Sequence, residues 1–191
     1  MRLFIGIELP DAIKTRAADV SADLRDRLST ASRRTTLRWV NPENLHITLW
    51  FLGEVADDRT AAIATALREP FRTPTFDLAI SGAGLFPASG APRTLWLGLT
   101  AGVDPLVALY GELSTRLPAL GFQPEKRAYS PHLTVARFKD VARPDAAAIR
   151  RAVAQTQADV GACSITALTL FRSRLSPKGS QYEPLLRVPL D

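Results

Sequence analysis

Two short segments of the chain carry the same pattern of chemically capable residues. Residues 46–49 read His-Ile-Thr-Leu, and residues 132–135 read His-Leu-Thr-Val. The chain has only two histidines, and both occupy the first position of this pattern. Imidazole changes its charge near neutral pH, so a pair of histidines can remove one proton and deliver another in a single reaction. His46 and His132 are therefore the first candidates for catalytic residues.

The residue types suit chemistry at phosphorus. One imidazole would remove a proton from an attacking water, and the other would protonate the departing oxygen. Thr48 and Thr134 each follow a histidine by two positions, where their hydroxyls could donate hydrogen bonds to phosphoryl oxygens. Opening a cyclic phosphate needs these two proton transfers, and no metal is required if hydroxyls and positive charge hold the oxygens.

Both segments alternate as β-strands do, with side chains two apart on the same face. His46 and Thr48 then share one face, and the apolar residues between and beside them share the other. His132 and Thr134 follow the same rule. The apolar face would anchor each strand in the core, so that the imidazole and the hydroxyl project from a rigid element.

The remaining elements are predicted from the period of the apolar residues and from the positions of Gly and Pro, which mark turns and the ends of helices and strands. Residues 81–93 are rich in Gly, Pro, Ala and Ser, and form either a link between two halves or a loop beside the site. Helices are predicted over 10–28, 58–68, 104–117 and 144–155. Strands are predicted over 2–8, 37–40, 45–52, 75–80, 94–99, 131–138, 163–172 and 181–188, with turns at 41–44 and 177–179.

Each half of the chain reads strand, helix, His-x-Thr strand, helix, strand. This repetition predicts a single domain over residues 1–191, made of two pseudo-symmetric lobes with the motifs at 46–49 and 132–135. Similar lobes tend to face each other about a two-fold axis. Such an arrangement would bring the two His-Thr faces together across a cleft.

Composition narrows the class of protein. The net charge is +5, and most of the cations are arginines, whose planar fork binds two phosphate oxygens at once. This charge permits a nucleic-acid partner without establishing one, since the chain is also alanine-rich and a compositional bias would give the same excess. One cysteine excludes an intramolecular disulfide, and with only two histidines in the chain it leaves few ligands for a zinc site. No carboxylates have the spacing of a magnesium site, so we expect neither metal nor cofactor.

The chain shows no segment that would place it at a membrane. No apolar run reaches the length of a bilayer-spanning helix. Residues 2–8 alternate as a first strand and do not read as a signal peptide. A cytoplasmic protein is expected.

These motifs resemble those of the 2H phosphoesterase superfamily, which is named for two His-x-Thr/Ser-x motifs. Within it, the chain is most similar to the bacterial and archaeal RNA 2′,3′-cyclic phosphodiesterases, also called 2′-5′ RNA ligases. The resemblance covers essentially the whole chain. It rests on residues 2–7, 39–40, 46–49, 51–54, 131–137 and 170–173, with Gly179 and Tyr182.

The resemblance implies an α+β, bilobal fold in which two antiparallel sheets face a central cleft and helices lie outside. It implies metal-independent hydrolysis of a 2′,3′-cyclic phosphate at an RNA end to a 2′-phosphate, with 2′-5′ joining of RNA ends as the reverse reaction. The substrates would be RNA ends, including tRNA fragments or nucleotides. By motif position, His46 would donate a proton and His132 would accept one. A monomer without an obligate protein partner is the default.

Alternation along the strands also assigns faces to Arg137 and to the aromatic residues near the motifs. Arg137 follows His132 by five positions, so plain alternation puts it on the opposite face, and reaching the phosphate would require a bulge, a strand end or a long side-chain reach. The resemblance favours a cleft role for it as a phosphate-binding residue. By the same alternation Trp50 shares the His46 face and Phe51 the core face. Core packing is the simpler interpretation for both, and for Trp39 and Tyr182.

Other functions fit parts of this pattern. The same chemistry could act on a small cyclic phosphate or on 2′-5′-linked oligonucleotides. A duplicated RNA-binding module that lacks catalysis is a further alternative, although binding alone would not need two titratable groups. A metal-dependent phosphodiesterase is disfavoured by the residue counts.

Overall fold

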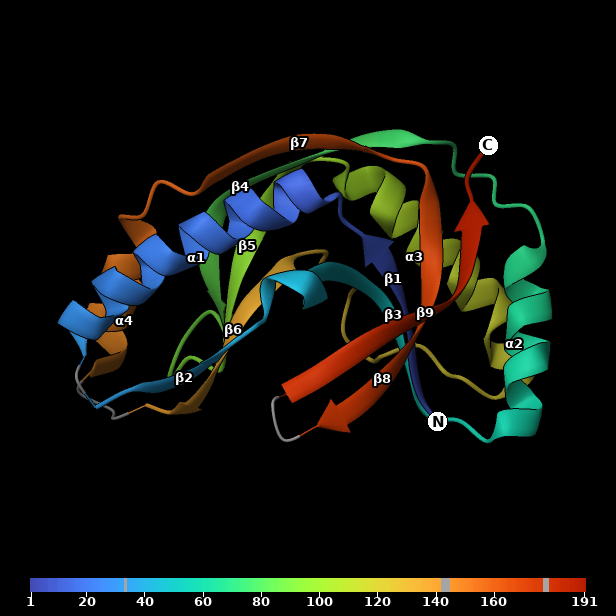
Figure 1. Cartoon of the computed structure of the whole chain (residues 1–191), viewed down its shortest axis with the longest axis horizontal. Coiled ribbons are helices and arrows are strands. Elements are labelled where there is room, and N and C mark those ends of the chain that lie inside the picture. Colours follow the sequence, from blue (N-terminus) through green and yellow to red (C-terminus); the bar gives the residue numbers. More distant parts are fainter. Residues whose placement is uncertain (33, 142–144, 177–178) are drawn as a thin grey trace.

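A computed structural model describes residues 1–32, 34–141, 145–176 and 179–191 of the chain. Within these residues there are four α-helices and nine β-strands (Figure 1). The helices are α1 (Asp11–Ala31), α2 (Asp57–Arg68), α3 (Val103–Arg116) and α4 (Ala146–Ala154). The strands are β1 (Arg2–Glu8), β2 (Thr36–Trp39), β3 (His46–Glu54), β4 (Phe76–Phe86), β5 (Thr94–Ala101), β6 (Leu133–Asp140), β7 (Asp159–Ile165), β8 (Ala167–Ser176) and β9 (Gly179–Pro189). Two 3₁₀ turns, η1 (Pro42–Asn44) and η2 (Pro118–Leu120), complete the elements.

The types and order of the predicted elements are confirmed with shifts at their ends, except that two segments differ by more than such shifts. The segment 81–93 is not wholly a loop, because β4 continues to Phe86 and only the residues after it lead to β5. The strand predicted over 163–172 is two strands, which Thr166 separates. They are separate because β7 pairs with β4 whereas β8 pairs with β1. The predicted helix start at Pro144 and turn residues Pro177 and Lys178 lie outside the described residues.

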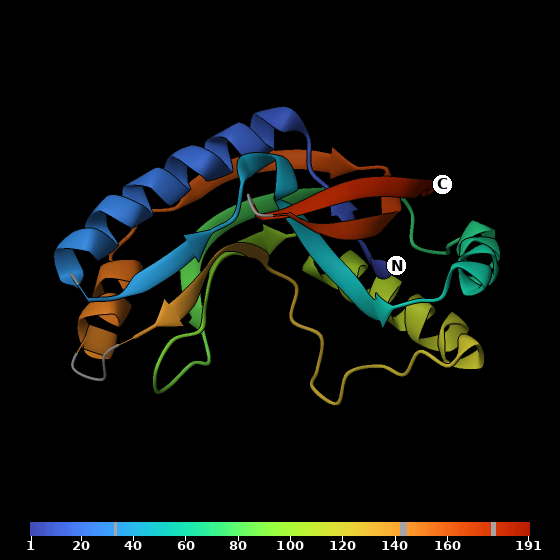
Figure 2. The same cartoon turned by 60° about the horizontal axis from the view of Figure 1, so that its bottom comes forward.

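The helices cover the two ends of the molecule. In α1 the buried residues Ile13, Ala17, Leu24 and Leu28 recur at helical spacing, so one face of this helix packs into the core. That face lies against β7 and α4, while α3 packs against β3. Figures 1 and 2 show α1 and α4 at one end of the molecule and α2 and α3 at the other. No helix in the described part of the chain is long and apolar enough to cross a membrane.

Strand pairing joins both halves into one curled antiparallel sheet, whereas we predicted two sheets. The strand order is β7-β4-β5-β6-β3-β1-β8-β9. The ninth strand, β2, pairs with β6 beyond the short contact between β6 and β3. The halves meet between β3 and β6 through one register pair, Ile47 with Leu133. These are the apolar residues between histidine and threonine in the two motifs. The two motifs therefore lie side by side at the centre of the sheet.

The two halves of this sheet do not correspond to the two halves of the sequence. β4 comes early in the chain, yet it pairs with β5 and β7 from the later half. Conversely, β8 comes late in the chain and pairs with β1. A duplicated, two-lobed domain over residues 1–191 stays a prediction, and in such a domain each half would exchange one strand with the other.

Each motif strand contains an irregularity just after its threonine. On β3 the register against β1 shifts between the pairs Ile5–Trp50 and Gly6–Thr48, which leaves Leu49 as an extra residue. On β6 the register against β5 shifts between the pairs that contain Ala136 and Thr134, which leaves Val135 as an extra residue. An extra residue in a strand reverses which face the following side chains occupy. The residues that directly follow Leu49 and Val135 thus face opposite to simple alternation. On β3 this holds up to Leu52, which a second register shift against β1 leaves as another extra residue.

Candidate active site

Both imidazoles are held in the same way. The Nδ1 atom of His46 lies 2.7 Å from the carbonyl oxygen of Asn44, and the Nδ1 atom of His132 lies 2.8 Å from that of Ser130. A carbonyl oxygen only accepts hydrogen bonds, so Nδ1 carries the hydrogen in both rings. In the neutral imidazole the remaining nitrogen, Nε2, then has a free lone pair. Both histidines therefore present the nitrogen that can take up or deliver a proton.

The threonine of each motif contacts the Nε2 nitrogen of its own histidine. Nε2 of His46 lies 3.0 Å from Oγ1 of Thr48, and Nε2 of His132 lies 3.1 Å from Oγ1 of Thr134. A hydroxyl both donates and accepts, so it can serve either protonation state of the imidazole. A substrate oxygen that entered between these groups would meet a ring nitrogen and a hydroxyl together.

The backbone beside His46 leaves room for its ring. A Cβ atom on Gly6 would lie 3.4 Å from Cδ2 of His46 and only 2.8 Å from the carbonyl oxygen of Ile47. The carbonyl group that orients the ring belongs to Asn44, at the end of η1, whose side-chain amide donates to the carbonyl oxygen of Ser180 at 2.6 Å. The orientation of His46 thus depends on β1, η1 and β9 together.

Aromatic rings surround both histidines, but more closely around His46. The centroid of its ring lies 4.7 Å from that of Phe4 and 5.1 Å from that of Tyr182, which meets it edge-on. His132 has Phe86 at 5.0 Å and Trp96 at 6.4 Å. Apolar surroundings disfavour the charged form of a titratable group.

Burial lowers the pKa of both histidines. It is the largest cause of the fall in the pKa of His46 from 6.5 to about 4, and the charges of Arg137, Lys14 and His132 add to it. The pKa of His132, which is less buried, is also lowered by burial and by the charge of Arg137. Hydrogen bonds to the backbone carbonyls act in the opposite direction. Because Arg137 acts on both rings, it lies in the electrostatic neighbourhood of both.

A cleft of about 520 Å³ opens beside these groups. Among the residues that the structure describes, three arginines line it and no carboxylate does. His132 borders this cleft through its contact with Thr134. The polar and charged lining residues are Arg2, Arg38, Asn41, Asn44, His46, Thr48, Thr134, Arg137, Ser173, Ser180 and Tyr182. The cleft is therefore suited to an anion.

The bulges decide which side chains reach the cleft. Arg137 lines it together with Thr134, although plain alternation puts it on the other face, because Val135 is the extra residue that reverses the order. The faces that alternation assigns to Trp50 and Phe51 are wrong for the same reason, and core packing is confirmed for Trp50 but not for Phe51. Trp50 is buried and its ring lies 5.1 Å from that of Tyr110, whereas Phe51 is 56% exposed and lines the cleft.

Trp39 and Tyr182 have mixed environments. Both line the cleft and are half-buried. The guanidinium of Arg25 lies 4.9 Å from the centroid of the Trp39 ring, so this indole also packs against α1. Core packing alone, as we predicted for them, describes neither residue.

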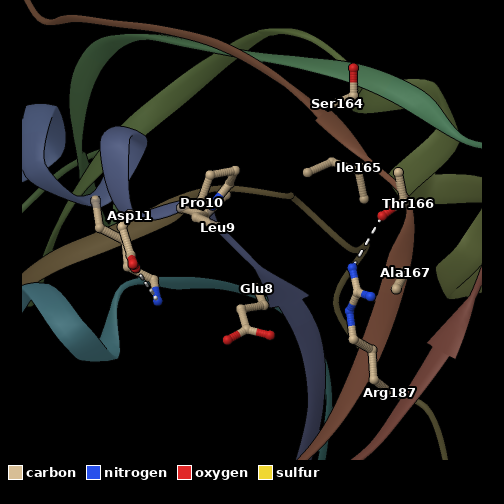
Figure 3. Close-up of a pocket in the computed structure, with 10 residues that line it drawn as sticks. Glu8, Leu9, Pro10, Asp11, Ser164, Ile165, Thr166, Ala167 and Arg187 are labelled. Carbon is tan, nitrogen blue, oxygen red and sulfur yellow. Dashed lines mark hydrogen bonds and ion pairs between the residues drawn. The ribbon is translucent and has the colours of Figure 1, made fainter.

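A second cavity, of about 360 Å³, lies where β1 leads into α1 (Figure 3). Acids and bases line it together, and the bases have partners. Lys14 lies 3.7 Å from Asp11, and Arg187 donates to Oγ1 of Thr166 at 3.1 Å. This balance of charge makes it a poorer site for a polyanion than the cleft beside the histidines.

One contact between the motifs could not be foreseen from their pattern. The hydroxyl of Tyr129, just before the second motif, donates to the backbone carbonyl of Thr48 in the first motif at 2.8 Å. The Tyr129 ring also stacks on Tyr110, with centroids 4.5 Å apart. This hydrogen bond supplements the single register pair between β3 and β6.

Comparison with known proteins shows the family to which the chain belongs. Residues 9–176 match the model of the 2′-5′ RNA ligase superfamily, and the chain belongs to this superfamily. It is 34% identical over 185 residues to an RNA 2′,3′-cyclic phosphodiesterase of Archaeoglobus fulgidus, covering 97% of this chain and 98% of the relative. A phosphodiesterase of the same name from Thermotoga maritima is 36% identical over 140 residues, covering 73% of this chain and 71% of the relative.

Solved structures show the same fold. The chain superimposes on LigT of E. coli, in a crystal structure complexed with 3′-AMP, with a TM-score of 0.77. The two are 28% identical, and the match covers 99% of this chain and 97% of LigT. The expected α+β fold is thereby confirmed.

Proposed function

We propose that this chain hydrolyses 2′,3′-cyclic phosphates at RNA ends to 2′-phosphates, using His46 and His132 as an acid–base pair without a metal. The observation that carries this proposal is the matched presentation of two Nε2 atoms beside a cleft whose described lining includes three arginines and no carboxylate. The names of the relatives, RNA 2′,3′-cyclic phosphodiesterases, support the same substrate. The reverse reaction would join RNA ends through a 2′-5′ bond.

The proposed steps balance in protons and bonds. The basic imidazole takes a proton from water as the water oxygen forms a bond to phosphorus. The bond between phosphorus and O3′ breaks, and the acidic imidazole gives its proton to O3′. Thr48, Thr134 and Arg137 hold the phosphoryl oxygens, whose negative charge grows in the transition state. The phosphate remains on O2′, and the histidines have exchanged protonation states.

The resemblance to 2H phosphoesterases assigns the acid to His46 and the base to His132. The protein's own electrostatics favour the opposite assignment, since burial lowers the pKa of His46 to about 4 and the less buried His132 is easier to protonate. A bound phosphate next to Nε2 would raise the pKa of the imidazole that it contacts. We assign His46 as acid on the condition that the substrate places O3′ on its side of the cleft.

The first test uses a short RNA ending in a 2′,3′-cyclic phosphate, with excess EDTA throughout. The variants are His46→Asn and His132→Asn, since an asparagine amide can keep the bond that Nδ1 makes to the backbone carbonyl while Nε2 is lost. We expect wild type to form a 2′-phosphate and each variant to lose about 10²–10⁴-fold in kcat. RNA affinity should change little. Folded wild type without turnover, or turnover that EDTA abolishes, would contradict the proposal.

A second substrate separates the two roles. In a cyclic phosphate with sulfur in place of O3′, the leaving group is a thiolate, which departs without a proton because thiols are far more acidic than alcohols. The variant that lacks the acid should recover most of its rate on this substrate, and the variant that lacks the base should not. Recovery by His46→Asn supports the assignment above, and recovery by His132→Asn reverses it.

A further inference from the structure

The cleft carries more positive charge than one phosphate requires. Arg38 on β2 and Arg137 on β6 are direct cross-strand partners, so their side chains leave the same face of the sheet. Like charges in this relation destabilise a strand pair. Among the described residues, no carboxylate lies within 4 Å of either guanidinium to offset this repulsion. An arginine pair of this kind is suited to bind more than one negative group.

The two arginines are not equivalent in position. Arg137 lowers the pKa of both histidines, so it belongs with the reacting phosphate. Arg38 is not among the main causes of either lowering. Its guanidinium instead lies at the start of β9, where a Cβ atom on Gly179 would come within 3.3 Å of Nη2 of Arg38. Arg38 therefore lies at the rim of the cleft, one strand further out than Arg137.

We propose that Arg38 binds a second phosphate of the RNA chain, the one on the 5′ side of the terminal nucleoside, and that the enzyme consequently prefers oligonucleotides to mononucleoside cyclic phosphates. This inference rests on the proposed function. The chemistry of the substrate specifies which phosphate this is. A cyclic phosphate is the 3′ terminus of its strand, so the only neighbouring phosphate in the chain is on the 5′ side. A nucleoside 2′,3′-cyclic phosphate has no group there for Arg38 to bind.

Other features of the rim fit a strand that continues outward. Arg38 is exposed, as an arginine must be to meet a flexible strand, and the half-buried Trp39 next to it also lines the cleft. A planar guanidinium binds phosphate with two parallel hydrogen bonds. Charge-assisted hydrogen bonds of this type change affinity by about 10- to 100-fold.

The test compares two substrates and four proteins. The substrates are a nucleoside 2′,3′-cyclic phosphate that lacks a 5′-phosphate, and a dinucleotide that ends in the same cyclic nucleotide. The proteins are wild type, Arg38→Ala, Arg38→Lys and the control Arg68→Ala, which removes one exposed positive charge from the last turn of α2. Thermal unfolding of each variant is measured alongside, and Arg38→Gln replaces Arg38→Ala if the latter is unstable.

We expect wild type to show a kcat/KM about 10- to 100-fold higher for the dinucleotide than for the mononucleotide. Arg38→Ala should lose this preference by losing activity on the dinucleotide alone, and Arg38→Lys should keep part of it. The control should match wild type on both substrates. Equal use of both substrates by wild type, or an equal loss on both in Arg38→Ala, would overturn the inference and leave the proposed function intact.

Affinity provides a readout that does not depend on turnover. The dissociation constant of the dinucleotide product, with its 2′-phosphate, is measured for wild type and Arg38→Ala over a range of salt concentrations. Loss of one phosphate contact should reduce the slope of log affinity against log salt by about 0.7. Unchanged slopes would contradict the role of Arg38, whether or not the substrates are hydrolysed. Failure to hydrolyse either substrate would separately refute the proposed function.

Discussion

At the scale of single residues, the site consists of two imidazoles in one tautomer and in unequal surroundings. The backbone carbonyls of Asn44 and Ser130 hold the hydrogen on Nδ1 in both rings, so each Nε2 keeps the lone pair that can accept a proton. Burial among Phe4 and Tyr182 makes His46 the harder of the two to protonate. An acid–base pair needs one neutral and one protonated ring, and this inequality favours that mixed state over a range of pH.

The pH dependence of kcat/KM follows from these pKa values. Below about pH 4 both rings are mostly protonated, because the pKa of His46 is about 4, and above pH 6.5 both are mostly neutral, because the pKa of His132 is below its usual value of 6.5. We expect a bell-shaped profile in the free enzyme with its maximum between these limits. Arg137→Ala removes a positive charge that lowers both pKa values, so its maximum should move to higher pH. A wild-type maximum above pH 7, or no shift in the variant, would contradict this account.

At the scale of elements, the site depends on two bulged strands and on how they are joined. The extra residues Leu49 and Val135 occupy the last position of each four-residue motif. Each turns the residue five positions after its histidine into the cleft, which is Phe51 on one strand and Arg137 on the other. The two strands share one register pair, so the hydrogen bond from Tyr129 to the Thr48 carbonyl has a large part in setting their separation.

Tyr129→Phe tests this connection between β3 and β6. The change removes the hydrogen bond and keeps the ring that stacks on Tyr110. Leaving the Thr48 carbonyl without this donor should cost about 1–3 kcal/mol of unfolding free energy. We expect kcat to fall about tenfold with little change in KM, because the histidines lose their relative position and the phosphate ligands stay. Steady-state kinetics and chemical denaturation measure both effects.

Tyr110→Phe is the matched control for that experiment. It removes a hydroxyl from the other ring of the stack and leaves the Tyr129 hydrogen bond in place. Equal kinetic effects of the two substitutions would mean that the stack, and not the hydrogen bond, sets the geometry.

At the scale of the whole molecule, the chain forms one sheet by exchanging strands between its two sequence halves. β4, from the first half of the chain, pairs with β5, the first strand of the second half. β8, from the second half of the chain, pairs with β1, the first strand of the first half. Neither half of the chain could therefore form its part of the sheet alone. Changes at the site should accordingly appear in the stability of the entire fold, including its dependence on pH.

Acid should destabilise the fold partly through His46. The pKa of His46 is about 4 in the folded protein and 6.5 in the unfolded chain. Between these values the unfolded chain therefore binds a proton that the native protein does not. The native state loses stability as pH falls through this window, by on the order of 3 kcal/mol for a shift of this size. We expect His46→Asn to lose correspondingly less than wild type between pH 6.5 and 4. Urea denaturation across that range measures the difference, and parallel losses in both proteins would refute it.

Residue types and local periods were sufficient to predict the helices, the strands and the two motifs. Each depends on interactions within a few residues, such as the alternation that puts His46 and Thr48 on one face. The same rule was wrong for Trp50 and Phe51, since a bulge forms between a strand and a partner distant in sequence. Local rules also did not predict the continuous sheet, the exchange of β4 and β8, or the contact of Tyr129 with Thr48.

The sequence by itself thus determined which groups could do the chemistry, because two histidines and two threonines in a repeated pattern are a property of the residues. Only the tertiary structure decided which side chains accompany them. Arg137 and Phe51 reach the cleft because a strand's register against its neighbour, and hence the face that each residue occupies, is set by long-range pairing. Arg38 enters the cleft for the same reason, since only pairing of β2 with β6 brings it opposite Arg137.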